Sequence, residues 1–485
     1  MDSDTDRIVE AINGSKASGF HYKTWFTAGM GFFTDAYDLF IIGVVLTLLP
    51  LAGWQKLTTF ETSLIASTAL IAAVVGATIF GRLLDRLGRK AVYGLELIIL
   101  VIGALGSAFL TPVNGIAALI AWRFILGIGI GGDYATSSVI MSEYSNTKNR
   151  GRFIGMVFSM QSLGLVAGPL VALGFLTSGV VPVITWRLLL AMGAIPAAVV
   201  IYYRRRMPEP PKYSAIVRGN VNKAAKDLTS YANINVSVTS QKAAAKSHLS
   251  IIRILTDWRL LALIIGTAGS WFLMDWALYG NSIMSSDMLG FLVPSTLTGI
   301  SHVIRSTELS ALIFGVAAFP GYWIATFTMD RLGRKPIQIV GFAMMAISFG
   351  ILGIFSYLAT PAYVVQFLIL YGISYFFIEF GPNVTTFVYP PEVFPISARG
   401  TGSGLAAAGG KIGAFIGTFL NLFIIAKFHL SGLFLVLSAL AVIGLLLTVF
   451  LLPEPKGKAL EAISRDSDYL ESEKGETAKA AQVEN

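Results

Sequence analysis

The 485-residue sequence has no cysteine, and only 13% of its residues carry a charge. The absence of cysteine excludes a disulfide framework and a thiolate metal site. The charged fraction is about half that of an average soluble protein, whereas 54% of the residues are apolar and the mean hydropathy is +0.69. These values exclude a soluble globular enzyme and a disordered chain, and they favour an integral membrane protein.

Motifs of the common enzyme classes are also missing. The sequence contains no P-loop, no zinc-ligand spacing and no nucleophile elbow. We therefore expect no catalytic residues, no metal or other cofactor, and no ATP hydrolysis on this chain. The four histidines lie at the edges of the apolar runs or outside them, so a proton path through a membrane would depend on carboxylates.

The apolar residues come in runs of about 20, which is the length of a helix that crosses lipid. A β-barrel would instead show alternating apolar and polar residues. Because backbone groups in lipid must bond within their own segment, we expect an all-α membrane protein. The predicted spans cover residues 24–50, 63–84, 91–111, 115–143, 152–178, 186–203, 259–283, 308–329, 336–359, 362–389, 401–427 and 430–452.

Basic residues gather in the loops that follow every second predicted span. The even number of spans places both termini on one side, and the excess of Lys and Arg identifies that side as the cytoplasm. The net charge of +8 therefore indicates membrane orientation and no nucleic-acid partner. The basic residues assigned to these loops are Arg82, Arg86, Arg89, Lys90, Lys148, Arg150, Arg152, Arg204, Arg205, Arg206, Arg331, Arg334, Lys335 and Arg399.

The two halves of the sequence repeat. The segment DRLGRK occurs at 85–90 after the second span and again at 330–335 after the eighth. Two other features recur at a similar offset of about 245 residues, a Glu followed by Arg-Gly and the tripeptide PEP at 208–210 and 453–455. Parallel repeats of six spans are typical of a transporter that rocks around a central site.

We therefore predict two pseudo-symmetric six-helix halves, at 1–203 and 258–455. Between them, 204–257 is predicted to be a cytoplasmic linker with short surface helices at Asn222–Leu228 and Gln241–Ile252. The charged segment 456–485 is predicted to be a disordered cytoplasmic tail.

The repeated DRLGRK loops and the twelve-span plan resemble the major facilitator superfamily. Within it, FTDAYDLF at 33–40, GGDY at 131–134 and SEY at 142–144 resemble the phosphate:proton symporter family. That family usually continues GGDY with Pro-Leu-Ser, whereas this chain has Ala-Thr-Ser at 135–137, so a different local helix geometry is expected there. The resemblance implies proton-coupled symport of inorganic phosphate by alternating access, in a plasma-membrane protein that works as a monomer.

Two carboxylates in the first span are separated by three residues. Asp35 and Asp38 share one helix face by this spacing. Two close carboxylates in a low dielectric do not both ionise easily, so one is expected to hold a proton near neutral pH. A capping or pairing role for one of them is the alternative. In the fourth span, Asp133 lies mid-membrane in a glycine-rich helix, and Arg123 on the same helix either snorkels outward or has a functional partner.

The seventh span carries one chemically distinct stripe. Trp271, Asp275 and Tyr279 are spaced by four and so project from one helix face. All three side chains donate hydrogen bonds when the carboxyl is protonated, whereas an ionised Asp275 repels an anion. This difference predicts coupling between proton and anion binding. An aromatic stripe packed on a neighbouring helix would explain Trp271 and Tyr279 but not Asp275.

The remaining polar residues in the spans complete the predicted sites. The lone Lys411 in an apolar helix requires a carboxylate or an anion, and the resemblance implies a pair with Asp275 in the empty carrier. Glu379 is a further titrating site or a buried tyrosine partner, and Glu96 extends the proton route or pairs with an adjacent basic loop. The predicted substrate-binding set is Tyr134, Gln161, Trp271, Asp275, Tyr279, Asn383 and Lys411. For Tyr134, Gln161 and Asn383 this role is what the family resemblance implies, and an interhelix hydrogen bond is the alternative for Gln161. The predicted proton-coupling set is Asp35, Asp38, Asp133, Asp275, Glu379 and Glu96.

The charged residues of the repeated loops are predicted to form a gate. They are interpreted as ion pairs between the halves that latch the outward-open state, and they carry no information on the substrate. The predicted gate consists of Asp85, Arg89, Glu143, Arg150, Asp330, Arg334, Glu392 and Arg399.

Two other functions stay open at this stage. A proton-coupled porter for a sugar or an organic acid would share the same frame. Sugar porters typically carry paired glutamines in the seventh span, where this chain has WFLMD at 271–275, and Lys411 would also suit a carboxylate. A non-transporting membrane sensor is the third hypothesis, with the linker and the tail as its only signalling surfaces.

Overall fold

The computed structural model describes residues 3–232, 234–238, 249–283, 285–466 and 468–469. Secondary structure in these ranges is helical throughout, with no strand. Eleven of the described helices are long and apolar enough to cross a membrane. The chain is therefore a multi-pass membrane protein with the all-α fold that its hydropathy predicts.

The first half of the molecule is built from helices α2 to α9. A capping box starts α3, in which Thr58 accepts from the Glu61 N–H and Glu61 accepts from the Thr58 N–H. The sixth span is divided at Gly193 into two helices. The bounds are α2 Gly19–Leu48, α3 Thr59–Leu87, α4 Arg89–Val92, α5 Leu95–Phe109, α6 Ile116–Tyr144, α7 Arg150–Thr177, α8 Pro182–Met192 and α9 Ala194–Arg206.

The second half runs from α13 to α20 and contains two π-helical segments, at Phe314–Ala318 and Glu379–Asn383. The second of these includes Gly381, whose backbone angles are not helical. Pro382 follows it, and proline is a common cause of such kinks. The bounds are α13 Trp258–Ser282, α14 Ser285–Met288, α15 Gly299–Ile313, α16 Phe319–Leu332, α17 Arg334–Ile354, α18 Val364–Ile378, α19 Val384–Val393 and α20 Arg399–Leu451.

Helix α20 accounts for the difference between twelve predicted spans and eleven apolar helices. It is 53 residues long, and an unbroken helix of that length would extend about 80 Å, far more than the roughly 30 Å of bilayer hydrocarbon. His429 interrupts it with φ 60° and ψ 179°. The reversal at this residue separates the two spans predicted at 401–427 and 430–452.

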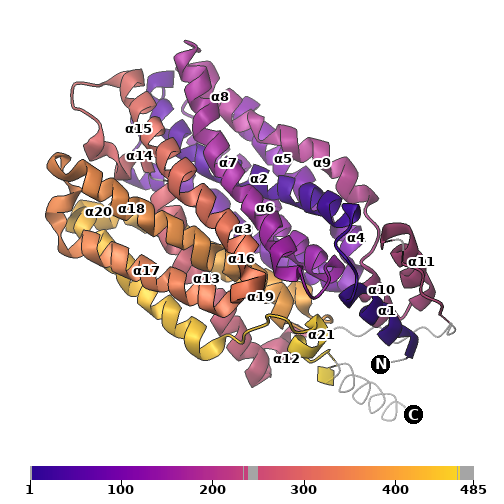
Figure 1. Cartoon of the computed structure of the whole chain (residues 1–485). Helices are drawn as coiled ribbons and strands as arrows, with labels where there is room; N and C mark the ends of the chain where they lie inside the picture. Colours follow the sequence, from indigo (N-terminus) through magenta and orange to yellow (C-terminus); the bar gives the residue numbers. More distant parts are fainter. Residues whose placement is uncertain (1–2, 233, 239–248, 284, 467, 470–485) are drawn as a thin grey trace.

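The two halves lie side by side, and the first and last described helices, α1 Ser3–Asn13 and α21 Leu460–Ser464, lie at the same end of the bundle, the end with the termini (Figure 1). Small residues let the halves approach closely. A Cβ atom on Gly81 of α3 would lie only 2.6 Å from the carbonyl oxygen of Gly400 on α20. The short helices α1 Ser3–Asn13, α10 Pro211–Ile216, α11 Val221–Ala232, α12 Ile251–Thr256 and α21 Leu460–Ser464 gather at the end with the termini.

The linker and the first part of the tail are more ordered than predicted. Helix α11 contains the surface helix expected at Asn222–Leu228, and α12 overlaps the end of the second one, most of which lies outside the described residues. The tail prediction of disorder from residue 456 is wrong for α21. There, Glu461 pairs with the buried Lys212 of α10 at 3.0 Å, a contact between distant segments that local composition does not reveal. Residues 470–485 lie outside the described ranges.

Candidate functional site

Tyr134, Gln161 and Tyr279 meet at the centre of the bundle, from three different helices. The hydroxyls of Tyr134 on α6 and Tyr279 on α13 are 2.8 Å apart. The side-chain amide of Gln161 on α7 donates to both oxygens, at 2.7 and 3.1 Å. The two halves of the protein thus share one hydrogen-bonded cluster, which is where the sequence places the substrate.

Lys411 of α20 joins this cluster as its only bonded cation among the described residues. Its ammonium group donates to Asp275 Oδ2 at 3.0 Å and to the Tyr279 hydroxyl at 2.9 Å. It also lies 4.1 Å from the ring centres of Tyr134 and Tyr279, a cation–π distance. The structure therefore contains the Lys411–Asp275 pair that was expected from the family resemblance. Asp275 Oδ1 has no hydrogen-bond partner in the described part of the chain.

Tyr322 extends the network and was missed by the sequence interpretation. Its hydroxyl donates to Gln161 Oε1 at 2.6 Å and accepts from the Asn383 amide at 2.6 Å. The same amide of Asn383 also donates to Glu379. One continuous chain of polar contacts therefore runs from Glu379 to the Lys411–Asp275 pair. Tyr322 lies in an ordinary aromatic-rich stretch of α16, and no local pattern distinguishes it from a packing tyrosine.

The indole of Trp271 packs beside the cluster. Its ring centre is 6.0 Å from that of Tyr134. A Cβ atom on Gly410 would lie 2.5 Å from the indole, so the glycine before Lys411 is required for α20 to approach α13. Each of the predicted substrate-binding residues is at most 1% exposed. The site is closed to solvent on both sides.

Arg204 is the main correction to the sequence interpretation. The charge pattern assigned it to a cytoplasmic loop, but the side chain is fully buried. Its two terminal nitrogens bind Asp133 at 2.6 and 2.9 Å, and one of them also binds Glu96 at 2.9 Å. Arg204 lies in the last turn of α9, and helical side chains point back toward the helix N-terminus, which directs this one into the bundle.

Glu96 therefore has a buried partner in α9, and it also accepts from the Gly94 N–H at 2.8 Å. Of the two predicted roles, pairing with a basic segment agrees with this geometry. A Cβ atom on Gly31 of α2 would lie 2.0 Å from both Asp133 Oδ2 and an Arg204 nitrogen. The packing of α2 against this ion cluster thus depends on a glycine at position 31.

Asp35 and Asp38 are both buried on α2, and none of their carboxylate oxygens has a hydrogen-bond partner among the described residues. The charge of Asp35 interacts with Asp133 and Arg204, whereas that of Asp38 interacts with Arg123. Arg123 does not snorkel, because it is fully buried and donates to the Asp38 carbonyl at 2.9 Å. The two acids therefore differ in their main charged partners, and Asp35 also interacts with Asp38 and Lys411.

The predicted gate residues come together at the end of the bundle that carries the termini. Glu143 binds Arg89 of its own half at 2.7 Å and Arg399 of the other half at 3.4 Å. Asp85 accepts from the backbone N–H groups of Gly400 and Thr401, at 3.0 and 2.7 Å.

The second repeat forms the same arrangement. Glu392 binds Arg334 at 2.8 Å and Arg150 at 2.7 Å, and Asp330 accepts from the N–H groups of Gly151 and Arg152 at 3.2 and 2.9 Å. Each acid at the start of a DRLGRK loop thus binds the first turn of a helix in the opposite half. These contacts close the bundle at this end.

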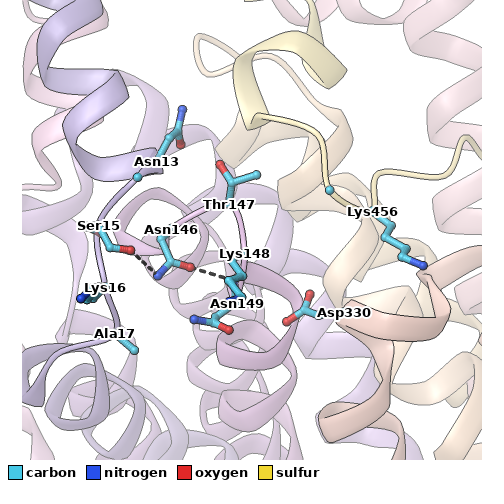
Figure 2. Close-up of a pocket in the computed structure, with 12 residues that line it drawn as sticks. Asn13, Ser15, Lys16, Ala17, Asn146, Thr147, Lys148, Asn149, Asp330 and Lys456 are labelled. Carbon is cyan, nitrogen blue, oxygen red and sulfur yellow. Dashed lines mark hydrogen bonds between the residues drawn. The ribbon is translucent and has the colours of Figure 1, made fainter.

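A pocket of about 720 Å³ opens onto the gate from the side of the termini (Figure 2). It lies between the two halves, with Asn13 and Asn146 on one side and Asp330 and Lys456 on the other. Asn146 braces the first side by donating to the Ser15 carbonyl at 2.8 Å. Solvent therefore reaches the outer surface of the gate but not the central cluster.

Two pseudo-symmetric helical halves around a shared buried site define a membrane carrier. The sequence model of the family described as "Sugar (and other) transporter" matches residues 24–466. The chain belongs to this family. A protein of Oryza sativa subsp. japonica named "Probable inorganic phosphate transporter 1-12" is 36% identical, over 96% of this chain and 95% of the relative. "Low affinity inorganic phosphate transporter 1" of Petunia hybrida is 34% identical, over 98% of each chain.

Solved structures share the fold. The major facilitator superfamily proton:xylose symporter XylE bound to 6-bromo-6-deoxy-D-glucose superposes with a TM-score of 0.76 at 21% identity, over 93% of this chain and 99% of that one. The partially occluded inward open form of XylE from E. coli superposes with a TM-score of 0.71 at 19% identity, over 91% of this chain and 100% of that one. The chain therefore has the major facilitator fold, and its family and fold are those of transporters, not of enzymes.

Proposed function

We propose that this protein is a secondary active transporter that carries inorganic phosphate inward together with protons. The observation that carries the proposal is the buried cluster of tyrosines, amides and one lysine, in a chain whose relatives are named as inorganic phosphate transporters over nearly their whole length. The proposal includes a plasma-membrane location, both termini in the cytoplasm and function as a monomer.

Phosphate recognition would use the hydrogen-bond donors of the central cluster. Phosphate oxygens accept from hydroxyl, amide, indole and ammonium groups, and bonds to the lysine are strengthened by its charge. The ammonium of Lys411 is held by Asp275 at 3.0 Å, so an ionised Asp275 both repels the anion and occupies its cation. Protonation of Asp275 removes both obstacles, which makes phosphate binding and proton binding mutually favourable.

The acids of α2 offer the second proton-binding position. Asp133 accepts two guanidinium bonds from Arg204, as a deprotonated carboxylate does. Asp35 lies in the field of the same ion pair without a hydrogen-bond partner in the described residues. We assign proton exchange to Asp35 and Asp38, and the role of a fixed anion to Asp133 in its pair with Arg204.

Alternating access follows from the gate. The state described here has its central site buried and the end with the termini closed by paired contacts in both repeats. Opening toward the cytoplasm separates Glu143 from Arg399 and Glu392 from Arg150, while the pairs within each half are retained. The inward-open state must therefore lose the two crossing ion pairs, together with the hydrogen bonds that Asp85 and Asp330 accept from the opposite half.

The direct test is uptake of labelled phosphate by the purified protein in liposomes, with the outside more acidic than the inside. We expect accumulation above equilibrium that stops when a protonophore removes the gradient. Unlabelled phosphate should compete, whereas hexoses and small carboxylates should not. Accumulation that ignores the proton gradient, or competition by a hexose or a carboxylate in place of phosphate, would refute the proposal.

A further inference from the structure

A second small cavity lies away from the transport site, between the start of α2 and the end of α9. Its volume is about 170 Å³, and its walls include Lys23, Thr24, Thr27, Tyr202, Tyr203 and Arg206. Both helix ends belong to the side of the bundle that carries the termini. Neither the transport cycle nor the gate uses these side chains.

The cavity is positively charged. Lys23 and Arg206 both line it, and neither forms an ion pair with a carboxylate in the described part of the chain. Each cation instead lies against a tyrosine, with the Arg206 guanidinium 4.1 Å from the ring of Tyr202 and the Lys23 ammonium 6.0 Å from that of Tyr203. The two aromatic contacts leave the donor groups of both cations open to an anion.

A buried hydroxyl group also points to a polar ligand. Thr24 lines the cavity and is 1% exposed, yet its hydroxyl has no hydrogen-bond partner among the described residues. A buried hydroxyl without a partner costs free energy. An oxygen-rich ligand in the cavity would accept from Thr24 and from both cations.

The depth of the cavity in the membrane indicates the source of that ligand. Two of its wall residues are exposed tyrosines, with Tyr202 54% and Tyr203 45% exposed. Exposed tyrosines of this kind mark the level of the lipid headgroups, and clustered Lys and Arg at that level attract anionic lipids. The phosphate groups of phospholipids lie at this level of the membrane.

We propose that this cavity binds the phosphate group of an anionic phospholipid from the leaflet on the side of the termini. The headgroup phosphate accepts from Lys23, Arg206 and Thr24, and the acyl chains run along the apolar surfaces of α2 and α9. Lipid binding in this cavity does not depend on what the central site transports. A result against phosphate transport would therefore leave the lipid proposal standing, and the reverse also holds.

The cavity also touches the buried ion cluster. Thr27, in its wall, offers its carbonyl to Arg204 Nε at 3.4 Å, and Arg204 is the partner of Asp133. Arg206 lies two positions after Arg204 on α9. A lipid that holds the end of α9 against α2 therefore stabilises the wall of the proton-binding region.

The test is native mass spectrometry of the full chain, titrated with phosphatidylglycerol or with phosphatidylcholine as the neutral reference. We expect saturable binding of phosphatidylglycerol with a preference over phosphatidylcholine. Replacing both cations, as Lys23→Gln with Arg206→Gln, should weaken phosphatidylglycerol binding about twenty-five-fold, since each cation near anionic headgroups contributes about fivefold. Thr24→Val, which keeps the shape of the side chain, should weaken it several-fold.

The matched control is Arg305→Gln with Lys427→Gln. These basic residues of α15 and α20 are placed on the opposite side of the membrane by the alternation of the predicted spans, so their replacement should leave the preference unchanged. In a further arm of the experiment, the phosphatidylglycerol titration is repeated with millimolar inorganic phosphate present. Persistent lipid binding in its presence supports the headgroup, whereas displacement by inorganic phosphate would show a site for the free ion and overturn the proposal. Equal lipid binding by the parent and the double cavity variant would also overturn it.

Discussion

At the scale of single residues, the transport site is held together by side chains that each bridge two partners. Tyr322 connects Gln161 to Asn383, so its hydroxyl orients one amide from each half. Removing it leaves both amides with an unmet bond in a buried site, which costs about 1–3 kcal/mol. We expect Tyr322→Phe to weaken phosphate binding roughly tenfold in calorimetric titrations. Tyr363→Phe, at an exposed tyrosine of the same half, should have no effect, and unchanged binding by the Tyr322 variant would contradict this role.

Arg204 has the largest predicted effect on stability. Its removal leaves the carboxylates of Asp133 and Glu96 buried without their cation, and breaking a buried pair in this way costs about 3–5 kcal/mol. We expect Arg204→Gln to lower the thermal unfolding midpoint strongly, and an added Asp133→Asn change to recover part of the loss. The neighbouring Arg205→Gln is the control, because Arg205 is exposed. Equal midpoints for the two arginine variants would exclude this role.

Some residues of this site can be predicted from the sequence, and others cannot. The stripe at 271–279 follows from helical spacing alone, and Lys411 stands out as a charge in an apolar run. Tyr322 and Arg204 do not stand out, because their roles arise from which helices pack together. A charge at a helix end is interpreted as a loop residue unless the direction of its side chain is known.

At the scale of helices, close approach is set by glycines. Helix α2 passes over the Asp133–Arg204 pair at Gly31, where any Cβ atom would overlap the ion pair. We expect Gly31→Ala to reduce proton-driven uptake by at least tenfold, since it displaces α2 and its two acids. Gly174→Ala in α7 is the matched control, because a Cβ atom there meets nothing within 4 Å and alanine favours the helix. Normal uptake by the Gly31 variant would show that α2 tolerates the shift.

The tail helix responds to pH through Asp466, which lies outside the membrane spans. Burial raises the pKa of the Asp466 carboxyl to about 6, despite the nearby Arg399. A carboxyl whose pKa is higher in the docked state than its ordinary value of 3.8 favours docking at low pH. Docking of the tail helix is therefore expected to become weaker as pH rises from about 4 to 6, and then to change no further.

Hydrogen exchange of residues 456–469 measures this docking. In the parent chain, protection of α21 should decrease over that pH interval after correction for the intrinsic exchange rate. Asp466→Asn should remove this decrease, because the amide does not titrate. Below about pH 4.5 the opposite trend should then remain, because the charge of Lys212 helps to lower the pKa of Glu461 to about 2. A decrease of protection between pH 4 and 6 that persists in this variant would assign the titration to another group.

At the scale of the whole molecule, composition and hydropathy predict the architecture well. Apolar runs predict the spans, and the DRLGRK repeat predicts two halves, since lipid permits few other solutions. Each gate acid binds a helix start in the opposite half, as the repeat suggests. The ordered start of the tail was not predictable, because it depends on Lys212 in the linker and Glu461 in the tail meeting across the end of the bundle.

The central claim is that protonation of Asp275 frees Lys411 for the anion. The most direct measurement is phosphate affinity as a function of pH, by calorimetry, for the parent chain and for Asp275→Asn. The variant also serves as the control for the titration of phosphate itself. The account predicts that the affinity of the parent falls relative to the variant as pH rises, approaching tenfold per pH unit where Asp275 ionises. Parallel pH profiles for the two proteins would contradict it.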